Sequence, residues 1–444
     1  MFDYLTAREL AAKVRAGEVS AAETVDDFLD RLDARNPALN AVVSVDADRA
    51  RRLAARRDAD PGLGGPLQGV PMTIKDAFDV AGLRTTLGAT VLDHLATRSS
   101  TVAARLEGAG AIIVGHSNVP SFLADYKTDN EIFGRTSNPW ATDRTPGGSS
   151  GGAAAALAAG ITPLDIGSDV AGSLRLPPHF CGVYGLKTTE HRVPLTGFYP
   201  LPDETPRTVR VMCALGPLAR DLDDLDVALR VIAGPDGVDF DVAPAPLAER
   251  REIDLTRVRL TVVPALPGGH VAPSLHARVG QIAAAASDVG VQVTDSLPAI
   301  DFSALRIVGD LIDAISEILG PGARHLNDAQ RSLSWYLTAL GQRDRFAAAF
   351  ATFFDDHDAI LLPAGTTTAF HHDSDWYGDL GGLLVFANFA GLPALTAPAG
   401  LDDDGLPMGV QLVGPRWSET RLLDIAAALE EAQVLPGFRR PPGY

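Results

Sequence analysis

Three segments of the sequence carry side chains whose types and order could support chemistry. They are TIKD at 73–76, which contains Lys75, PGGSSGG at 146–152, and GSDVAGSLRLP at 167–177. A lysine amine can move protons, and a serine hydroxyl can act as a nucleophile when a base lies beside it. Taken singly, each segment indicates little, because an isolated lysine is usually a solvated charge and a Gly-Ser loop is usually a tight turn.

The glycine clusters do not match the common phosphate-binding motifs. A P-loop requires GxxxxGK[ST], and no lysine follows either cluster. A dinucleotide fingerprint requires a third glycine at the start of a helix, whereas Gly108-Ala109-Gly110 continues into apolar residues. The sequence therefore argues against both kinds of phosphate site.

Residues 147–151 satisfy the pattern GxSxG, which would make Ser149 the serine of a nucleophile elbow. An elbow places its serine directly after a buried strand. The residues that precede Ser149 here, NPWATDRTP, are typical of a loop instead. The context therefore argues against an elbow.

The elements that must position these segments alternate between helix and strand. We predict helices at 5–17, from Ser20 to about 36, and at 47–57, 102–108, 153–159, 221–233, 275–289 and 305–319. We predict short strands at 41–45, 111–115, 259–263 and 291–294, with strand, turn and helix again at the end of the chain. This alternation favours a mixed or parallel β-sheet covered by helices.

The composition excludes several classes of protein. The 444 residues are 46% apolar and 21% charged without a long apolar run, and the net charge of -18 argues against nucleic-acid partners and anionic membranes. Two cysteines, Cys181 and Cys213, cannot form a disulfide framework, and no Cys/His spacing suggests a metal. The charged N-terminus lacks the apolar stretch of a signal peptide, so we expect a cytoplasmic protein.

In their order along the chain, the lysine, PGGSSGG and G-[ST]-D-x-x-G-S-x-R-x-P resemble the amidase signature family. Ser149 and Ser173 are 24 residues apart (173 − 149), which matches the family's two catalytic serines. Further agreement lies in GVPMTIKD, NVP at 118–120, FGRTSNP, FCGVYGLK, AGLPAL and GLPMGVQLVG. The resemblance implies an α/β fold without cofactor: one domain over 1–444, with a central mixed sheet covered on both faces and N-terminal helices (about 1–60) packed outside.

Carried over by position, the resemblance makes Ser173 the nucleophile, Ser149 a bridging serine held by a cis peptide bond, and Lys75 the final base. A lysine can serve as a base only when burial lowers its pKa, and the apolar stretch VPMTI before Lys75 suits such burial. The relay would move the proton of Ser173 through Ser149 to Lys75, and then reverse to protonate the leaving nitrogen. Water would then cleave the acyl-enzyme.

The turn around the nucleophile is expected to stabilise the developing oxyanion through consecutive backbone N–H groups. These groups belong to Val170, Ala171, Gly172 and Ser173. We expect Asp169 and Arg175 to form an ion pair that fixes the loop, and Ser150 to assist by hydrogen bonding.

Three residues depart from the family pattern. The family usually has glycine at Ala171, threonine at Ser168 and a small residue at Asp165. The methyl group of Ala171 restricts the backbone, and a carboxylate at Asp165, in a strand expected to be buried, needs a partner. No catalytic atom is lost, so we expect activity with an altered substrate shape.

Alignment of NVPSFLADY with the family places Leu123, Ala124 and Tyr126 near the substrate, with Phe133 and the loop 363–380. Such a largely apolar lining favours a hydrophobic or aryl amide. The same relay could cleave esters and carbamates (urethanes).

A second hypothesis is the amidase-like subunit of a glutamine-dependent amidotransferase complex. That role needs a glutamine pocket with paired charges and a broad docking surface, and the acidity and modest length of the chain argue against it. A non-catalytic scaffold is the weakest hypothesis, because Lys75, Ser149 and Ser173 are all present. The expected partners are therefore a small-molecule amide, ester or carbamate, with no nucleic acid and no membrane, acting on a monomer or homodimer.

Overall fold

The N-terminal region forms helices whose starts are marked by capping side chains. Helices α1 (Ala7–Arg15) and α2 (Ala21–Leu39) each begin with a capping box, and Asp46 caps α3 (Ala47–Ala59). Helix α2 runs past Pro37, where its end was predicted, and stops where Asn40 adopts a left-handed conformation at φ 51°. The computed structural model describes residues 2–60, 64–200, 210–267, 269–308, 310–311, 332–374 and 380–444.

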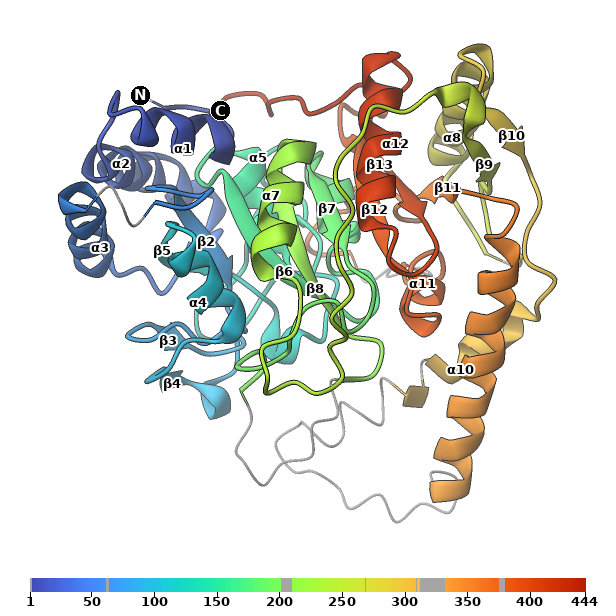
Figure 1. Ribbon diagram of the computed structural model, residues 1–444, viewed down its shortest axis with the longest axis horizontal. Coiled ribbons are helices and arrows are strands. Elements are labelled where there is room, and N and C mark those ends of the chain that lie inside the picture. The colour runs from blue at the N-terminus through green and yellow to red at the C-terminus, as the bar shows by residue number, and fades with distance from the viewer. Residues whose placement is uncertain are drawn as a thin grey trace.

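A mixed sheet of eight strands forms the centre of the described part of the molecule (Figure 1). Its spatial order is β10-β9-β11-β13-β12-β7-β8-β6; the pairs β10–β9 and β9–β11 are parallel, and the other pairs are antiparallel. The strands are β6 (Leu164–Asp169), β7 (Tyr184–Lys187), β8 (Ala214–Ala219), β9 (Arg259–Val262), β10 (Gln292–Thr294), β11 (Ala359–Pro363), β12 (Ala394–Leu401) and β13 (Pro407–Val413).

A smaller sheet lies beside the β6 edge and carries the segment VPMTIKD. Strand β5 (Ile112–Ser117) pairs with β1 (Val42–Val43) on one side and, in parallel, with β2 (Pro71–Lys75) on the other. Strand β2 packs against β6 of the large sheet. A short hairpin of β3 (Arg84–Thr85) and β4 (His94–Leu95) lies outside both sheets.

Helices cover both faces of the large sheet. On β8, Leu218 packs with α5 (Gly151–Ala158), whereas Leu215 and Ala219 point to the opposite face and pack with α7 (Leu222–Ile232). Helix α6 (Leu176–Cys181) joins α5, and α12 (Glu419–Glu431) joins α7. The remaining helices are α4 (Thr101–Gly108), α8 (Pro273–Asp288), α10 (Leu333–Phe353) and α11 (Val385–Phe389).

The predicted α/β fold, a single domain with a mixed sheet between layers of helices, is confirmed. Most predicted elements are present within a few residues. No element was predicted at the positions of β3, β4, β7, β8, β11, α6, α10 and α11. Most of the helix predicted at 305–319 lies outside the described residues. Within the described part of the chain, no helix is long and apolar enough to cross a membrane.

Candidate active site

The three predicted catalytic side chains meet at the junction of the two sheets. Lys75 is the last residue of β2, Ser149 lies in the loop before α5, and Ser173 follows β6. The Nζ of Lys75 is 2.7 Å from the Oγ of Ser149, and that Oγ is 3.0 Å from the Oγ of Ser173. The three groups therefore form a continuous chain of hydrogen-bonding distances.

The peptide bond between Gly148 and Ser149 is cis, as predicted. In this geometry the backbone N–H of Ser149 donates to the Oγ of Ser173 at 3.0 Å. A Cβ at Gly148 would lie 2.5 Å from the carbonyl oxygen of Asp125, so no larger residue fits there. The glycine-rich loop thus brings both the hydroxyl and the amide of Ser149 to the same oxygen atom.

Lys75 is fully buried among hydroxyl groups. Besides Ser149, its Nζ contacts the Oγ of Ser150 at 2.9 Å and the Oγ of Ser168 at 3.0 Å. Burial lowers the pKa of Lys75 to about 7, and the nearby Asp169, Cys213 and Asp165 oppose that effect. A large fraction of Lys75 is therefore the neutral amine at neutral pH.

The three side chains differ in their exposure to solvent. Lys75 is 0% and Ser149 2% exposed, whereas Ser173 is partly exposed. A ligand can thus reach the Ser173 hydroxyl while Lys75 stays enclosed.

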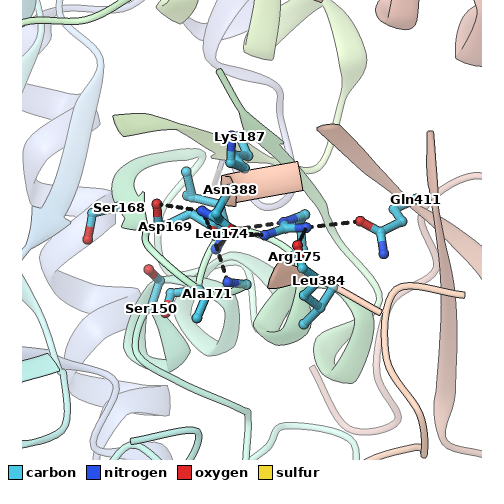
Figure 2. A network of polar contacts seen from close by, with 12 residues as sticks. Ser150, Ser168, Asp169, Ala171, Leu174, Arg175, Lys187, Leu384, Asn388 and Gln411 are labelled. Atoms are coloured by element: carbon cyan, nitrogen blue, oxygen red, sulfur yellow. Dashed lines mark hydrogen bonds and ion pairs between the residues drawn. The ribbon is translucent and has the colours of Figure 1, made fainter. Parts of the chain in front are cut away.

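A buried ion pair holds the turn that carries Ser173. Asp169 and Arg175 interact through two contacts of 3.0 Å, and both side chains are fully buried (Figure 2). The carboxylate of Asp169 also accepts from the N–H of Gly172 at 2.7 Å and of Leu174 at 3.0 Å. Burial favours a raised pKa for Asp169, but Arg175 outweighs it and holds the pKa well below its usual range. The expected ion pair is therefore present and closes the turn on both sides of Ser173.

Residues distant in the sequence complete this ion pair. Arg175 donates to Asn388 Oδ1 at 2.5 Å, to Gln411 Oε1 at 3.2 Å and to the carbonyl oxygen of Leu384 at 2.7 Å. Asn388 lies in α11 and Gln411 in β13, and Figure 2 shows them on either side of Arg175. The sequence gives no local signal for these two partners, because only the fold brings them to Arg175.

The predicted oxyanion donors need one correction, at Gly172. Its N–H is taken by the carboxylate of Asp169, so that it is not available for an oxyanion. The N–H groups of Val170, Ala171 and Ser173 have no hydrogen-bond partner among the described residues. Gly172 has a different role, because its φ of 123° suits glycine and a Cβ there would lie 2.3 Å from Leu384 Cδ1.

Two of the departures from the family pattern lie beside Lys75. The Ser168 hydroxyl contacts Lys75, a contact that the sequence did not predict. Asp165 is fully buried in β6, and its Oδ2 accepts from the Thr73 Oγ1 at 2.5 Å. One oxygen of this buried carboxyl thus has a partner, whereas its Oδ1 has no hydrogen-bond partner among the described residues.

A cavity of about 790 Å³ opens next to the turn. Its lining is mostly apolar and includes two of the predicted residues, Ala171 and Tyr126, whose hydroxyl donates to the Ala171 carbonyl oxygen at 2.8 Å. The other lining residues are Leu266, Pro267, Gly269, Ile300, Asp301, Phe302, Ser303, Leu305, Arg306, Val308, Gly381, Gly382 and Val385. The wall from 266 to 308 had not been predicted.

The other predicted substrate residues do not line this cavity. Leu123 packs against the hydrophobic core, Ala124 is exposed, and the ring of Phe133 lies 5.6 Å from the guanidinium carbon of Arg84. In the predicted loop 363–380, Trp376 and Tyr377 lie outside the described residues. In the described part of the chain, no three His, Cys, Asp or Glu side chains are grouped so as to hold a metal ion.

Comparisons with known proteins point to one family. The family model "Amidase" matches residues 23–310 and 311–423. The chain is 33% identical to a subunit of the glutamyl-tRNA(Gln) amidotransferase of Symbiobacterium thermophilum, over 96% of each chain, and 33% identical to an acylamidase of Rhodococcus erythropolis, over 96% of this chain and 95% of the acylamidase. The structure of 6-aminohexanoate cyclic dimer hydrolase with substrate superimposes with a TM-score of 0.83, at 28% identity over 99% of this chain and 98% of that one. This chain belongs to the amidase signature family of carbon–nitrogen hydrolases.

Proposed function

We propose that the chain is an amidase that forms an acyl-enzyme on Ser173 and uses Lys75 as its base. The observation that carries this proposal is the continuous chain of contacts from the partly exposed Ser173, through Ser149, to a buried lysine whose pKa is lowered to about 7. A lysine accepts a proton in this pH range only when its environment disfavours the ammonium form.

The surroundings of Lys75 match the needs of a neutral amine. Such an amine has two N–H donors and one lone pair, and three hydroxyl oxygens lie within 3.0 Å of its Nζ. Ser149, at the shortest distance of 2.7 Å, donates to the lone pair, while Ser150 and Ser168 accept the two N–H groups. Lys75 is then ready to take a proton from Ser149.

In the acylation step, the Ser173 Oγ forms a bond to the substrate carbonyl carbon. The proton of Ser173 passes to the Ser149 Oγ as the proton of Ser149 passes to the Lys75 Nζ. When the tetrahedral intermediate collapses, the C–N bond breaks and the proton returns through Ser149 to the leaving nitrogen. Water repeats the same sequence on the acyl-enzyme and releases the acid.

The oxyanion of the intermediate is held by the backbone. The free N–H groups of Val170, Ala171 and Ser173 lie on the turn that the Asp169–Arg175 ion pair fixes. Donors that are fixed before the reaction stabilise developing charge without reorganising, which is commonly worth about 3 kcal/mol for each donor.

The cavity beside Ala171 supports a hydrophobic or aryl amide as substrate. Its volume of about 790 Å³ suits a small organic molecule, and six of its fifteen lining residues are leucine, isoleucine, valine or phenylalanine. Esters and carbamates (urethanes) share the tetrahedral intermediate, so we include them as substrates of the same site.

The alternative function is a role within an amidotransferase complex, which the Symbiobacterium thermophilum relative supports. A glutamine substrate needs charged partners for its α-amino and α-carboxylate groups, and Asp301 and Arg306 supply one of each sign in an otherwise largely apolar lining. The apolar majority of the lining favours an apolar amide as substrate, and the substrate panel distinguishes the two functions.

A substrate panel tests the proposal. The purified chain is assayed with aryl amides, primary amides including glutamine, esters and carbamates, alongside Ser173→Ala and a control variant, Ser296→Ala, at an exposed serine beyond β10. We expect turnover of apolar amides by the wild type and the control, and its loss in Ser173→Ala. Full turnover by Ser173→Ala contradicts the mechanism, and hydrolysis of glutamine alone favours the alternative.

A further inference from the structure

The relay leaves one buried acid next to it without a role. Asp165 lies in β6, is 0% exposed, and accepts a hydrogen bond of 2.5 Å from Thr73. Thr73 and Lys75 are two residues apart on β2, so their side chains point to the same face of that strand. The Asp165 carboxyl is thus hydrogen-bonded to the strand that carries the proposed base.

Asp165 and Asp169 both lie near Lys75, but they differ in whether another cation neutralises them. The groups that act on Lys75 are Asp169 and Asp165 of β6 and the thiol of Cys213, just before β8. Asp169 has a cation of its own in Arg175. Among the residues that the structure describes, no lysine, arginine or histidine lies within ion-pairing distance of Asp165, so Lys75 is the cation that responds to its charge.

We propose that Asp165 is a positioning residue whose own protonation determines whether Lys75 is a neutral amine or an ammonium ion. Asp165 holds a proton while Lys75 is a neutral base, and the ionised carboxylate holds Lys75 as an ammonium ion. This inference rests on the proposed function, in which Lys75 is the base. It assigns a role in the relay to the residue at which this chain departs from the family pattern.

Titration of the two groups in one pH range supports the coupling. Burial raises the pKa of Asp165 to about 7, against the opposing effects of the Thr73 and Ser117 hydroxyls and of Lys75. Burial lowers the pKa of Lys75 to about 7, and Asp165 is one of the groups that oppose this. Two groups that titrate together exchange protons as a pair, and each negative charge removed near Lys75 lowers the pKa of its amine.

Two substitutions test the inference, and both act in the same direction. Asp165→Asn keeps an acceptor for Thr73 but removes the charge, so that the Lys75 ammonium loses stabilisation. Thr73→Val removes a hydroxyl donor that favours the ionised carboxyl, so that Asp165 stays protonated to higher pH. Each variant should move the acid limb of the Ser173 reaction to lower pH, by about 0.5 unit or more for Asp165→Asn. The double variant should show no further shift.

The assay follows the pseudo-first-order rate of Ser173 modification by a phosphonyl fluoride from pH 5 to 9, using intact mass. In this reaction Ser173 Oγ forms a bond to phosphorus, fluoride leaves, and the proton passes to Lys75, so no natural substrate is needed. Asp224→Asn is the matched control, because Asp224 is also a buried acid, in α7, where it accepts from the N–H of Ala7 at 2.7 Å. Its pH profile should coincide with the wild-type profile.

The outcomes separate this inference from the proposed function. If Ser173→Ala is not modified but Asp165→Asn and Thr73→Val keep the wild-type acid limb, the role of Asp165 is wrong and the relay stands. If Ser173→Ala is modified as fast as the wild type, the relay itself is wrong. Should Asp165→Asn fail to fold by circular dichroism, Thr73→Val alone decides, because a purely structural role leaves its pH profile unchanged.

Discussion

At the level of single residues, the proposed catalysis requires that Lys75 be neutral when substrate binds. The protonated form of Lys75 cannot accept a proton from Ser149, and burial brings the pKa of Lys75 to about 7. Activity should therefore fall as the pH drops below about 7. Above pH 7 the activity should reach a plateau and stay constant until other groups titrate. Initial rates measured across this pH range with an apolar amide check the prediction, and a rate that stays constant down to pH 5 would contradict it.

Replacing Lys75 removes this base while leaving most of its volume in place. We expect Lys75→Met to lower kcat/KM by about 10²–10⁴-fold, the usual contribution of general acid–base catalysis. Steady-state kinetics with an apolar amide measure the loss, and Lys13→Met, an exposed lysine of α1, provides the control. A Lys75→Met variant that is as active as the control would contradict the assignment.

Some residues of the site could be predicted from the sequence, and others could not. The segments around Lys75, Ser149 and Ser173 carry the resemblance to the amidase signature family, and that resemblance predicted the cis bond and the meeting of the three side chains. The N–H of Gly172 was assigned wrongly, because its bond to Asp169 depends on how the turn folds back. The positions of Leu123 and Phe133 were predicted wrongly, because a short alignment does not show which way the side chains of a loop point.

At the scale of elements, the turn after β6 must hold its shape against α11. Gly172→Ala would place a methyl group 2.3 Å from Leu384 Cδ1, on a residue with a φ of 123°. We expect the turn to shift and kcat/KM to drop about 10²-fold, the size of effect that a small misplacement produces. The control is Gly280→Ala in α8, where a new Cβ meets nothing within 4 Å. Equal rates for the two variants would show that the turn tolerates the shift.

The ion pair between β6 and α6 should also matter for stability. Arg175→Met leaves the carboxylate of Asp169 buried without its cation, which commonly costs about 3–5 kcal/mol of unfolding free energy. Urea denaturation measures this loss, and Arg257→Met, at an exposed arginine paired with Asp254, should change stability by less than about 1 kcal/mol. A loss for Arg175→Met as small as that of Arg257→Met would contradict the role given to the pair.

The elements themselves were predicted unevenly. Helices with clear caps, such as α2 after Ser20 and α7 after Asp221, matched their predicted starts closely. Strands β7 and β11 and helix α6 were not predicted, since each is a short apolar segment whose structure is decided by its neighbours in the sheet. Asn388 and Gln411 were absent from the predicted site because they are distant from Arg175 in the sequence and contact it only in the folded chain.

At the scale of the whole molecule, distant parts of the chain build the site together. The three side chains of the proposed relay come from β2 and from the loops before α5 and after β6, while α11 and β13 support Arg175 from the C-terminal part. The C-terminal tail also returns to the first residues, where the rings of Tyr4 and Phe438 lie 5.9 Å apart. The mixed sheet was predictable from the alternating pattern and the family resemblance, but its strand order was not, since pairing partners leave no mark in one sequence.

Helix α10 packs on α11, the helix that carries Asn388, and so contributes to the support of Arg175. Phe350 of α10 is buried and stacks on Phe386 of α11 with ring centroids 5.5 Å apart. Phe350→Ala should lower the unfolding free energy by about 3–5 kcal/mol, whereas Phe240→Ala, at a ring that is 87% exposed, should have little effect. Thermal denaturation of both variants checks this prediction, and a Phe350→Ala variant as stable as Phe240→Ala would show that α10 does not support α11.

Peptide mapping after reaction with a phosphonyl fluoride locates the nucleophile directly, because the reagent forms a covalent adduct on it. The account predicts a single adduct on Ser173, formed more slowly as the pH falls below about 7 and abolished in Ser173→Ala. An adduct on Ser149, or labelling of Ser173 that is independent of Lys75, would contradict the relay from Ser173 through Ser149 to Lys75.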